Sequence, residues 1–143
     1  MKNDVQIAST VKNTVQESSF VDLVNWILAA QKCTTPWTIA VIFVDDAFIA
    51  ELHEKFMNIA GATDVITFNL TEVVEEPEGE IYISVDTAQK NAVEYNVSLD
   101  DELFRLTAHG VYHLLDYDDS TPDLRQEMTI LENKALEYIQ STL

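Results

Sequence analysis

Residues 106–119 read Leu106-Thr-Ala-His109-Gly-Val-Tyr-His113-Leu-Leu-Asp116-Tyr-Asp118-Asp119, which combines an apolar helical stripe with side chains that bind metals. His109 and His113 lie four residues apart. On an α-helix, a four-residue step turns a side chain by only about 40° and rises ~6 Å, so both imidazoles project from one stripe of the helix. Two ligands on one rigid turn are therefore prearranged to share a metal ion.

A third ligand is available in the acidic segment that follows the histidines. Asp119 lies where the chain leaves the helix, and a carboxylate is a hard oxygen ligand for zinc and related cations. We therefore expect His109, His113 and Asp119 to form one metal site. Asp116 is the second choice, because a rise of ~10 Å along the helix from His109 makes convergence on one ion awkward.

Two histidines at this spacing also arise by chance, so a simpler interpretation stays open. In it, His113 is half-buried and His109 is solvated, and both are ordinary residues of a packed helix. The stretch also has Gly110 where zinc proteases of the His-Glu-x-x-His type carry their glutamate base. The sequence therefore disfavours a zinc peptidase.

Composition limits the classes of protein that the chain can belong to. Its 143 residues, 47% of them apolar, predict one domain over residues 1–143 with a substantial core. A single cysteine, Cys33, and the absence of an apolar stretch near 18 residues indicate a cytoplasmic protein without a membrane partner. The net charge of −17 argues against a general electrostatic grip on nucleic acid, and no DNA partner is expected.

The apolar periodicity predicts an α+β fold in which a small, mostly four-stranded mixed sheet packs with about five helices. The metal site lies at the histidine-containing helix. Strands are expected at residues 3–8, Trp37–Val44, Asp64–Phe68 and Glu80–Val85. Helices are expected from a cap at Ser18-Ser19 to about Gln31, from a cap at Asp45-Asp46 to near Gly61, from Asp86 past Tyr95, from Ser98 through the histidines, and from Pro122 onward. The acidic segment Glu72–Gly79 is expected to be an exposed connection without a catalytic role.

Three motifs in the same order resemble those of the YbeY family of metal-dependent endoribonucleases, which are implicated in ribosomal RNA maturation. They are Thr63-Asp-Val-Ile-Thr-Phe68, Gly79-Glu-Ile-Tyr-Ile-Ser84, and His109-Gly-Val-Tyr-His113 with the continuation to Asp119. The order and spacing agree with the family from about Trp37 to Leu143. The agreement strongly favours a metal site over a chance pair of histidines.

This resemblance implies one Zn²⁺ per chain, held by His109, His113 and the residue at position 119, with water at the fourth position. An open position lets zinc lower the pKa of its bound water to about 7, which would supply a nucleophile for phosphodiester hydrolysis. The implied function is a zinc-dependent endoribonuclease in ribosomal RNA processing and ribosome maturation. The implied partners are ribosomal RNA and the small ribosomal subunit.

Three positions depart from the family pattern. Asp119 replaces a third histidine, and Asp116 replaces a glycine that Asp can imitate in the left-handed cap conformation. Met57 stands where the family commonly has an arginine, and a thioether cannot stabilise the charge of a phosphoryl-transfer transition state. The alternative function is therefore a metal-binding ribosome assembly factor of the same fold with weak or lost nuclease activity.

Three residues keep two interpretations each. Asp64 could orient a histidine ring through a hydrogen bond, as a tentative catalytic residue behind the ligands, or it could cap the preceding turn. Gly110 could allow a close approach of helix and strand, or it could leave room for substrate. His53 could donate a proton, or it could be an ordinary surface residue.

Overall fold

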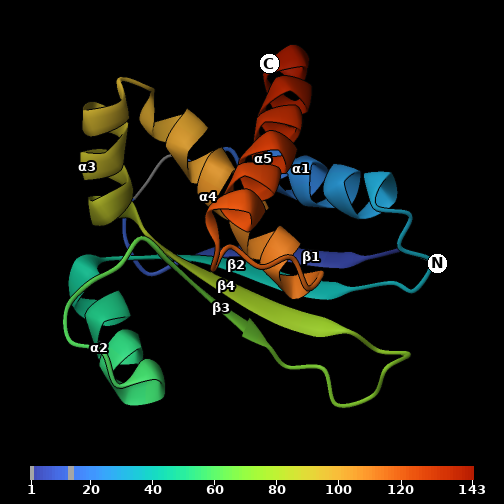
Figure 1. Ribbon diagram of the computed structural model, residues 1–143, viewed down its shortest axis with the longest axis horizontal. Coiled ribbons are helices and arrows are strands. Elements are labelled where there is room, and N and C mark those ends of the chain that lie inside the picture. The colour runs from blue at the N-terminus through green and yellow to red at the C-terminus, as the bar shows by residue number, and fades with distance from the viewer. Residues whose placement is uncertain (1, 13–14) are drawn as a thin grey trace.

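The structure is a computed structural model that describes residues 2–12 and 15–143, and a four-stranded mixed sheet organises them (Figure 1). The strands are β1 (Asp4–Ser9), β2 (Thr38–Val44), β3 (Val65–Asn69) and β4 (Glu78–Ser84). Their order is β1-β2-β4-β3. The first three strands of that order are parallel, and β3 runs antiparallel to β4 at the edge. Five helices complete the described part, which confirms the predicted α+β class.

One face of the sheet forms the main core. Ile39, Val41 and Phe43 alternate along β2, and their side chains are fully buried with Ile81 and Ile83 of β4. This alternation is the period of a strand whose one face is covered by helices. The helices α1 (Glu17–Ala30) and α4 (Leu99–Leu114) pack on this side, and α5 (Pro122–Thr142) packs against both (Figure 1).

The opposite face is covered in part by α2 (Asp46–Met57), which buries a smaller apolar cluster. Val44, Ile49 and Ile66 are its buried members. The ring centroids of Phe68 and Tyr82 lie 5.8 Å apart beside it, in an edge-to-face arrangement. The second cluster packs α2 against β3, and Met57 at the end of α2 lines the same cleft as β3 residues.

Helix α4 passes very close to the sheet at Gly110. A Cβ atom added to Gly110 would lie 2.6 Å from Cγ2 of Ile81. A β-branched side chain has little rotamer freedom with which to move away. This position therefore needs glycine for the close approach of helix and strand, which is one of the two interpretations that the sequence left open.

Most helix caps agree with the expected ones. Ser98 accepts a hydrogen bond from the Asp101 amide at the start of α4, Asp45 accepts one from Phe48 in α2, and Pro122 opens α5. The cap expected at Ser18-Ser19 is wrong. Helix α1 already begins at Glu17, and its N-cap residue makes no capping bond through its side chain.

Two other element boundaries differ from the expected ones. Helix α2 ends at Met57 rather than near Gly61, because Asn58 takes a left-handed conformation with φ 56° and closes the helix. Strand β4 begins at Glu78 and ends at Ser84, so the acidic connection is shorter than expected. The Ser84 hydroxyl accepts the Thr87 amide and starts α3 (Val85–Tyr95) without a loop.

Helix α5 is the longest, with 21 residues, yet it is amphipathic and buries only one stripe. Within residues 2–12 and 15–143, no helix combines the length and apolarity that crossing a bilayer requires.

The contact at Gly110 predicts that Gly110→Ala destabilises the protein. Overpacking costs ~1–3 kcal/mol, which outweighs the ~1 kcal/mol that alanine gains in helix propensity. We expect a net loss of up to about 2 kcal/mol in the free energy of unfolding, measured by urea denaturation. In an Ile81→Ala background, the same substitution should become neutral or stabilising. An equal loss in both backgrounds would contradict the packing explanation.

Candidate metal centre

Helix α4 presents its two histidines to one point. The Nε2 atoms of His109 and His113 lie 3.0 Å apart, and the ring planes are inclined by 77°. Both side chains are partly buried, with 18% and 30% of their surface exposed. Their approach follows from the four-residue spacing on one stripe of the helix.

The segment after α4 brings Asp119 to the same point. Asp116 adopts φ 71° and turns the chain out of the helix, in the left-handed conformation expected there. Asp118 then accepts hydrogen bonds from the amides of Asp119 and Ser120 and from the Ser120 hydroxyl. The hydroxyl bond from Ser120 is the main cause of a lowered pKa for Asp118. This local network holds the turn from which the Asp119 side chain reaches back to the histidines.

The three donor atoms have the spacing of a tetrahedral zinc site. Asp119 Oδ2 lies 3.4 Å from His109 Nε2 and 3.6 Å from His113 Nε2. Metal–ligand distances of 2.0–2.1 Å in a tetrahedron place neighbouring ligand atoms ~3.3 Å apart. His109, His113 and Asp119 could therefore form a metal site. Asp116, the second choice, lies outside this group.

Glu132 of α5 fixes the orientation of His109. Its Oε2 atom lies 2.6 Å from His109 Nδ1, and the Glu132 side chain is 5% exposed. A carboxylate at this distance accepts a hydrogen bond from Nδ1–H, which leaves Nε2 as the nitrogen that faces the candidate metal position. The same arrangement supports metal-binding histidines in many zinc proteins.

Glu132 is itself held by a chain of polar side chains. Arg105 donates to Glu132 at 3.4 Å and makes two hydrogen bonds to the buried Glu102. Asn91 of α3 bridges Glu102 and Asp64, at 3.2 Å from each carboxylate. Burial opposes the charged form of Arg105, but the bonds and charge of Glu102, followed by the charge of Glu132, raise the pKa of its guanidinium above the ordinary value. His109 is thus linked through four side chains, on α5, α4 and α3, to Asp64, directly before β3.

Asp64 occupies the far end of this chain. Its side chain bonds to Asn91 and not to either histidine ring. The structure thus brings together three of the proposed site residues, His109, His113 and Asp119, and leaves Asp64 outside that group, four hydrogen-bonded side chains from His109. His53 bonds to the Gly61 carbonyl through Nδ1 at 2.9 Å, which ties the end of α2 to the following turn.

Glu132 was not among the site residues predicted from the sequence. A signal was present, because Glu132 lies at helical spacing between Met128 and Ala135 on the buried stripe of α5. A carboxylate on such a stripe needs a polar partner inside the protein. The identity of that partner depends on how α5 packs against α4, which periodicity alone does not give.

The Tyr112 hydroxyl makes a further contact between α4 and α5. It donates to the Leu131 carbonyl at 3.2 Å. Burial, together with the charges of Tyr117 and Glu132, raises the pKa of Tyr112 to about 12, so the hydroxyl stays protonated at neutral pH. This bond keeps α5, and with it Glu132, in register with α4.

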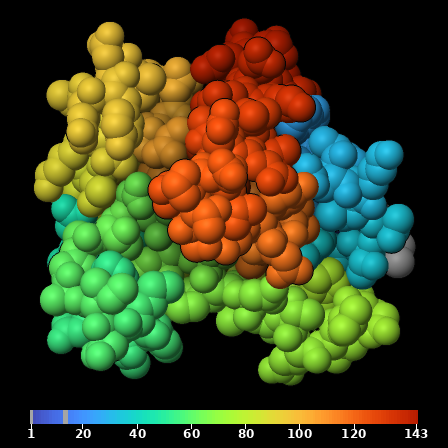
Figure 2. Space-filling model, in the orientation of Figure 1, coloured from blue at the N-terminus to red at the C-terminus, as the bar shows by residue number. Residues whose placement is uncertain are grey.

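The two histidines open into a cleft of about 370 Å³ between α4 and the edge strand β3. Its lining residues are Met57, Val65, Ile66, Thr67, Asn69, His109, His113 and Leu114. None of these described lining residues is a lysine or an arginine. In Figure 2, the orange surface around the end of α4 and the start of α5 stands above the green surface of α2 and β3. Met57 lies at this cleft, with 43% of its surface exposed.

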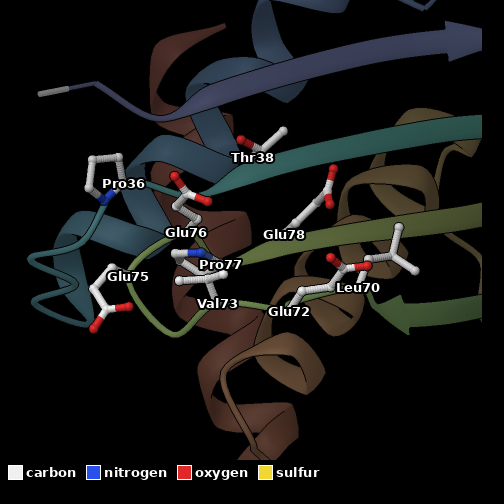
Figure 3. A pocket seen from close by; sticks show the side chains of 9 residues that line it. All are labelled: Pro36, Thr38, Leu70, Glu72, Val73, Glu75, Glu76, Pro77 and Glu78. Carbon is white, nitrogen blue, oxygen red and sulfur yellow. The ribbon is translucent and has the colours of Figure 1, made fainter.

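A second hollow lies where β2 and β4 begin, at Thr38 and Glu78 (Figure 3). Glu72, Glu75, Glu76 and Glu78 line it with Pro36, Thr38, Leu70, Val73 and Pro77. It shares no lining residue with the histidine cleft, and the side chains drawn there carry carboxylates without a histidine (Figure 3). Most of this hollow is formed by the acidic connection Glu72–Gly79, for which no catalytic role was predicted from the sequence.

Two histidines and a carboxylate that converge in an open cleft of an α+β fold are typical of metal-dependent hydrolases. A family model described as endoribonuclease YbeY matches residues 3–140 of this chain. A Chlorobaculum parvum protein named endoribonuclease YbeY is 35% identical over 136 residues, which cover 95% of each chain. A Desulforamulus reducens protein of the same name is 44% identical over 109 residues, or 71% of each chain. The chain therefore belongs to the endoribonuclease YbeY family.

A solved structure agrees with this assignment. The solution structure of a Thermotoga maritima protein superposes with a TM-score of 0.70 at 27% sequence identity. The match covers 96% of this chain and 90% of that one. The resemblance inferred from three sequence motifs is thus confirmed over nearly the whole chain.

The contact between Glu132 and His109 predicts a role in metal affinity. Glu132→Gln keeps the size of the side chain but removes the charge that holds the imidazole tautomer. We expect zinc affinity to fall by about 10- to 100-fold, as measured by competition with a chromophoric chelator. Glu127→Gln, an exposed position on the same helix, is the matched control and should bind zinc as the parent does. Equal affinities for both variants would show that Glu132 does not support the ligand.

The geometry also predicts which aspartate binds the metal. Asp119→Ala should weaken zinc binding by at least about 100-fold, which exceeds the loss expected for a supporting residue. Asp116→Gly should leave binding intact, because glycine suits the left-handed conformation at that position. Isothermal titration of both variants with zinc separates the two. Loss of binding in Asp116→Gly alone would reverse the assignment.

Proposed function

We propose that this protein is a zinc-dependent endoribonuclease that hydrolyses phosphodiester bonds of ribosomal RNA during ribosome maturation. The observation that carries the proposal is the convergence of His109, His113 and Asp119 at ligand spacing in an open cleft. Membership of the endoribonuclease YbeY family supports the reaction type. We further propose that the chain works as one domain in the cytoplasm, with the small ribosomal subunit as its partner.

Each site residue has a defined task in this proposal. His109 and His113 bind the metal through Nε2, and Asp119 adds one carboxylate oxygen. Glu132 accepts a hydrogen bond from Nδ1 of His109, which fixes the ring so that Nε2 is directed at the metal. A bound zinc ion would acidify a coordinated water and polarise a phosphoryl oxygen. A carboxylate in place of a third histidine lowers the net charge of the centre by one, which favours harder cations than a three-histidine site would.

The alternative is a metal-binding assembly factor with weak or lost nuclease activity. The observation in its favour is the side of the cleft formed by Met57, which offers a thioether and no positive charge. Lys55 is the nearest cation in sequence, but it lies on another face of α2 and contacts the Phe56 ring, with its amino group 5.4 Å from the ring centroid. The two functions differ in whether the metal-loaded protein cuts RNA.

Cleavage of ribosomal RNA by the zinc-loaded protein distinguishes the two functions. We expect the parent to cut a structured ribosomal RNA fragment slowly, and His113→Ala to lose both the zinc and the cleavage. Gel analysis of labelled fragment measures the rate. If the parent carries one zinc per chain and leaves the fragment intact, the assembly-factor function is favoured instead.

Met57→Arg tests whether the missing cation limits the reaction. A guanidinium at the cleft would stabilise the charge of the transition state, and removal of comparable groups costs other enzymes about 10²–10³ in rate. We expect a gain of at least tenfold in the cleavage rate. Met57→Gln is the control, because it is polar and of similar length without the charge. Equal rates for the two variants would mean that charge at position 57 is not limiting.

A further inference from the structure

The edge strand β3 presents a row of backbone groups to the side away from β4. The Ser84 amide donates to the Asp64 carbonyl, and the Leu70 amide donates to the Glu78 carbonyl. In an antiparallel pair, hydrogen-bonded residues alternate with residues whose N–H and C=O point the other way. Within β3, the backbone groups of Ile66 and Phe68 therefore hydrogen-bond to β4, while those of Val65, Thr67 and Asn69 point outward.

All three outward-facing residues also line the cleft beside the histidines, together with Ile66. Val65, Thr67 and Asn69 all border it, together with both histidines. In the part of the chain that the structure describes, no strand pairs with this edge of the sheet. The unused N–H and C=O groups of the edge thus run alongside the candidate metal centre, in steps of ~6.8 Å.

An RNA substrate in this cleft meets few other groups that can bind phosphate. The lining contains no lysine or arginine among its described residues, and Met57 lies on the side where a cation would be useful. The guanidinium of Arg105 is engaged by the carboxylates of Glu102 and Glu132. Besides the metal, the available donors are therefore neutral ones, chiefly the strand amides and the side chains of Thr67 and Asn69.

The geometry points to the outward edge of β3 as the track for the RNA backbone, an inference that rests on the proposed function. The amides of Val65, Thr67 and Asn69 donate hydrogen bonds to phosphate oxygens. The carbonyls of the same residues accept from ribose 2′-hydroxyls, which DNA lacks. Backbone groups thereby supply both the grip on phosphate and the preference for RNA in a strongly acidic protein.

The test removes one outward amide without breaking the sheet. Proline is tolerated on edge strands where the missing N–H faces away from the neighbouring strand, which is the situation at Thr67. Thr67→Val is the matched variant, because it loses the hydroxyl and keeps the amide. Both zinc-loaded variants are titrated into a fluorescein-labelled phosphorothioate RNA oligonucleotide, which retains its 2′-hydroxyls and resists hydrolysis. Anisotropy gives Kd, and zinc content reports the integrity of the centre.

We expect Thr67→Pro to bind the RNA about tenfold more weakly than Thr67→Val, as befits one lost hydrogen bond to a charged group. We also expect the parent to bind the DNA oligonucleotide of the same sequence more weakly than the RNA. If the parent binds and cuts RNA but the two variants have equal Kd, the edge is not the track, although the proposed function stands. Failure of the parent to bind or cut any RNA would overturn the proposed function as well.

A second measurement applies if Thr67→Pro loses its zinc. In ¹H–¹⁵N spectra of the zinc-loaded parent, the phosphorothioate RNA should shift the amides of Val65, Thr67 and Asn69 more than those of Ile66 and Phe68. Equal shifts along the strand would overturn the inference. A basic decapeptide that displaces the RNA and produces the alternating pattern more strongly would do so too, because the edge would then be a site for an added peptide strand.

Discussion

The buried ion pairs of Arg105 with Glu102 and Glu132 constrain the rest of the structure. Two carboxylates on α4 and α5 are almost fully buried, and one guanidinium compensates them. A buried charge without a partner is costly. Glu132 can therefore be buried beside α4 only where the two helices pack so that Arg105 reaches it. That packing places Glu132 against His109 Nδ1, and it thereby decides which nitrogen of the ring is free for a metal. The same set of contacts thus stabilises the packing of α4 against α5 and orients His109 for a metal ion.

The negative charge of the chain limits the interactions through which the candidate metal centre could bind RNA. A net charge of −17 repels a polyanion at long range, and the cleft itself is lined by apolar and neutral polar residues beside the histidines. A divalent ion in the centre would be the strongest local positive charge. The free edge of β3 adds backbone dipoles that need no basic side chain. In the proposed function, catalysis and RNA recognition would therefore depend on the metal and on hydrogen bonds more than on a basic surface.

The spacing of His109 and His113 was sufficient to predict their convergence, because both lie on one helix whose geometry is fixed. Asp119 was preferred over Asp116 from the expected end of that helix, and the left-handed turn at Asp116 is what brings Asp119 back to the histidines. Glu132 and the role of Gly110 could not be assigned from sequence, because each depends on the register of α4 against another element. Glu132 requires the packing of α5, and Gly110 requires that Ile81 lie beneath it. The early end of α2 escaped prediction for a local reason, since Asn58 can adopt the left-handed conformation that was expected of Gly61.

The nature of the metal centre can be measured directly by X-ray absorption at the zinc edge, on protein loaded with one equivalent of zinc. Coordination by His109, His113 and Asp119 predicts two imidazole ligands and oxygen ligands at about 2.0–2.2 Å, with the multiple-scattering pattern of imidazole rings. In Asp119→His the spectrum should change to three imidazoles at similar distances. A parent spectrum without imidazole scattering, or with a six-oxygen shell typical of an ion bound at the protein surface, would contradict a two-histidine, one-carboxylate centre.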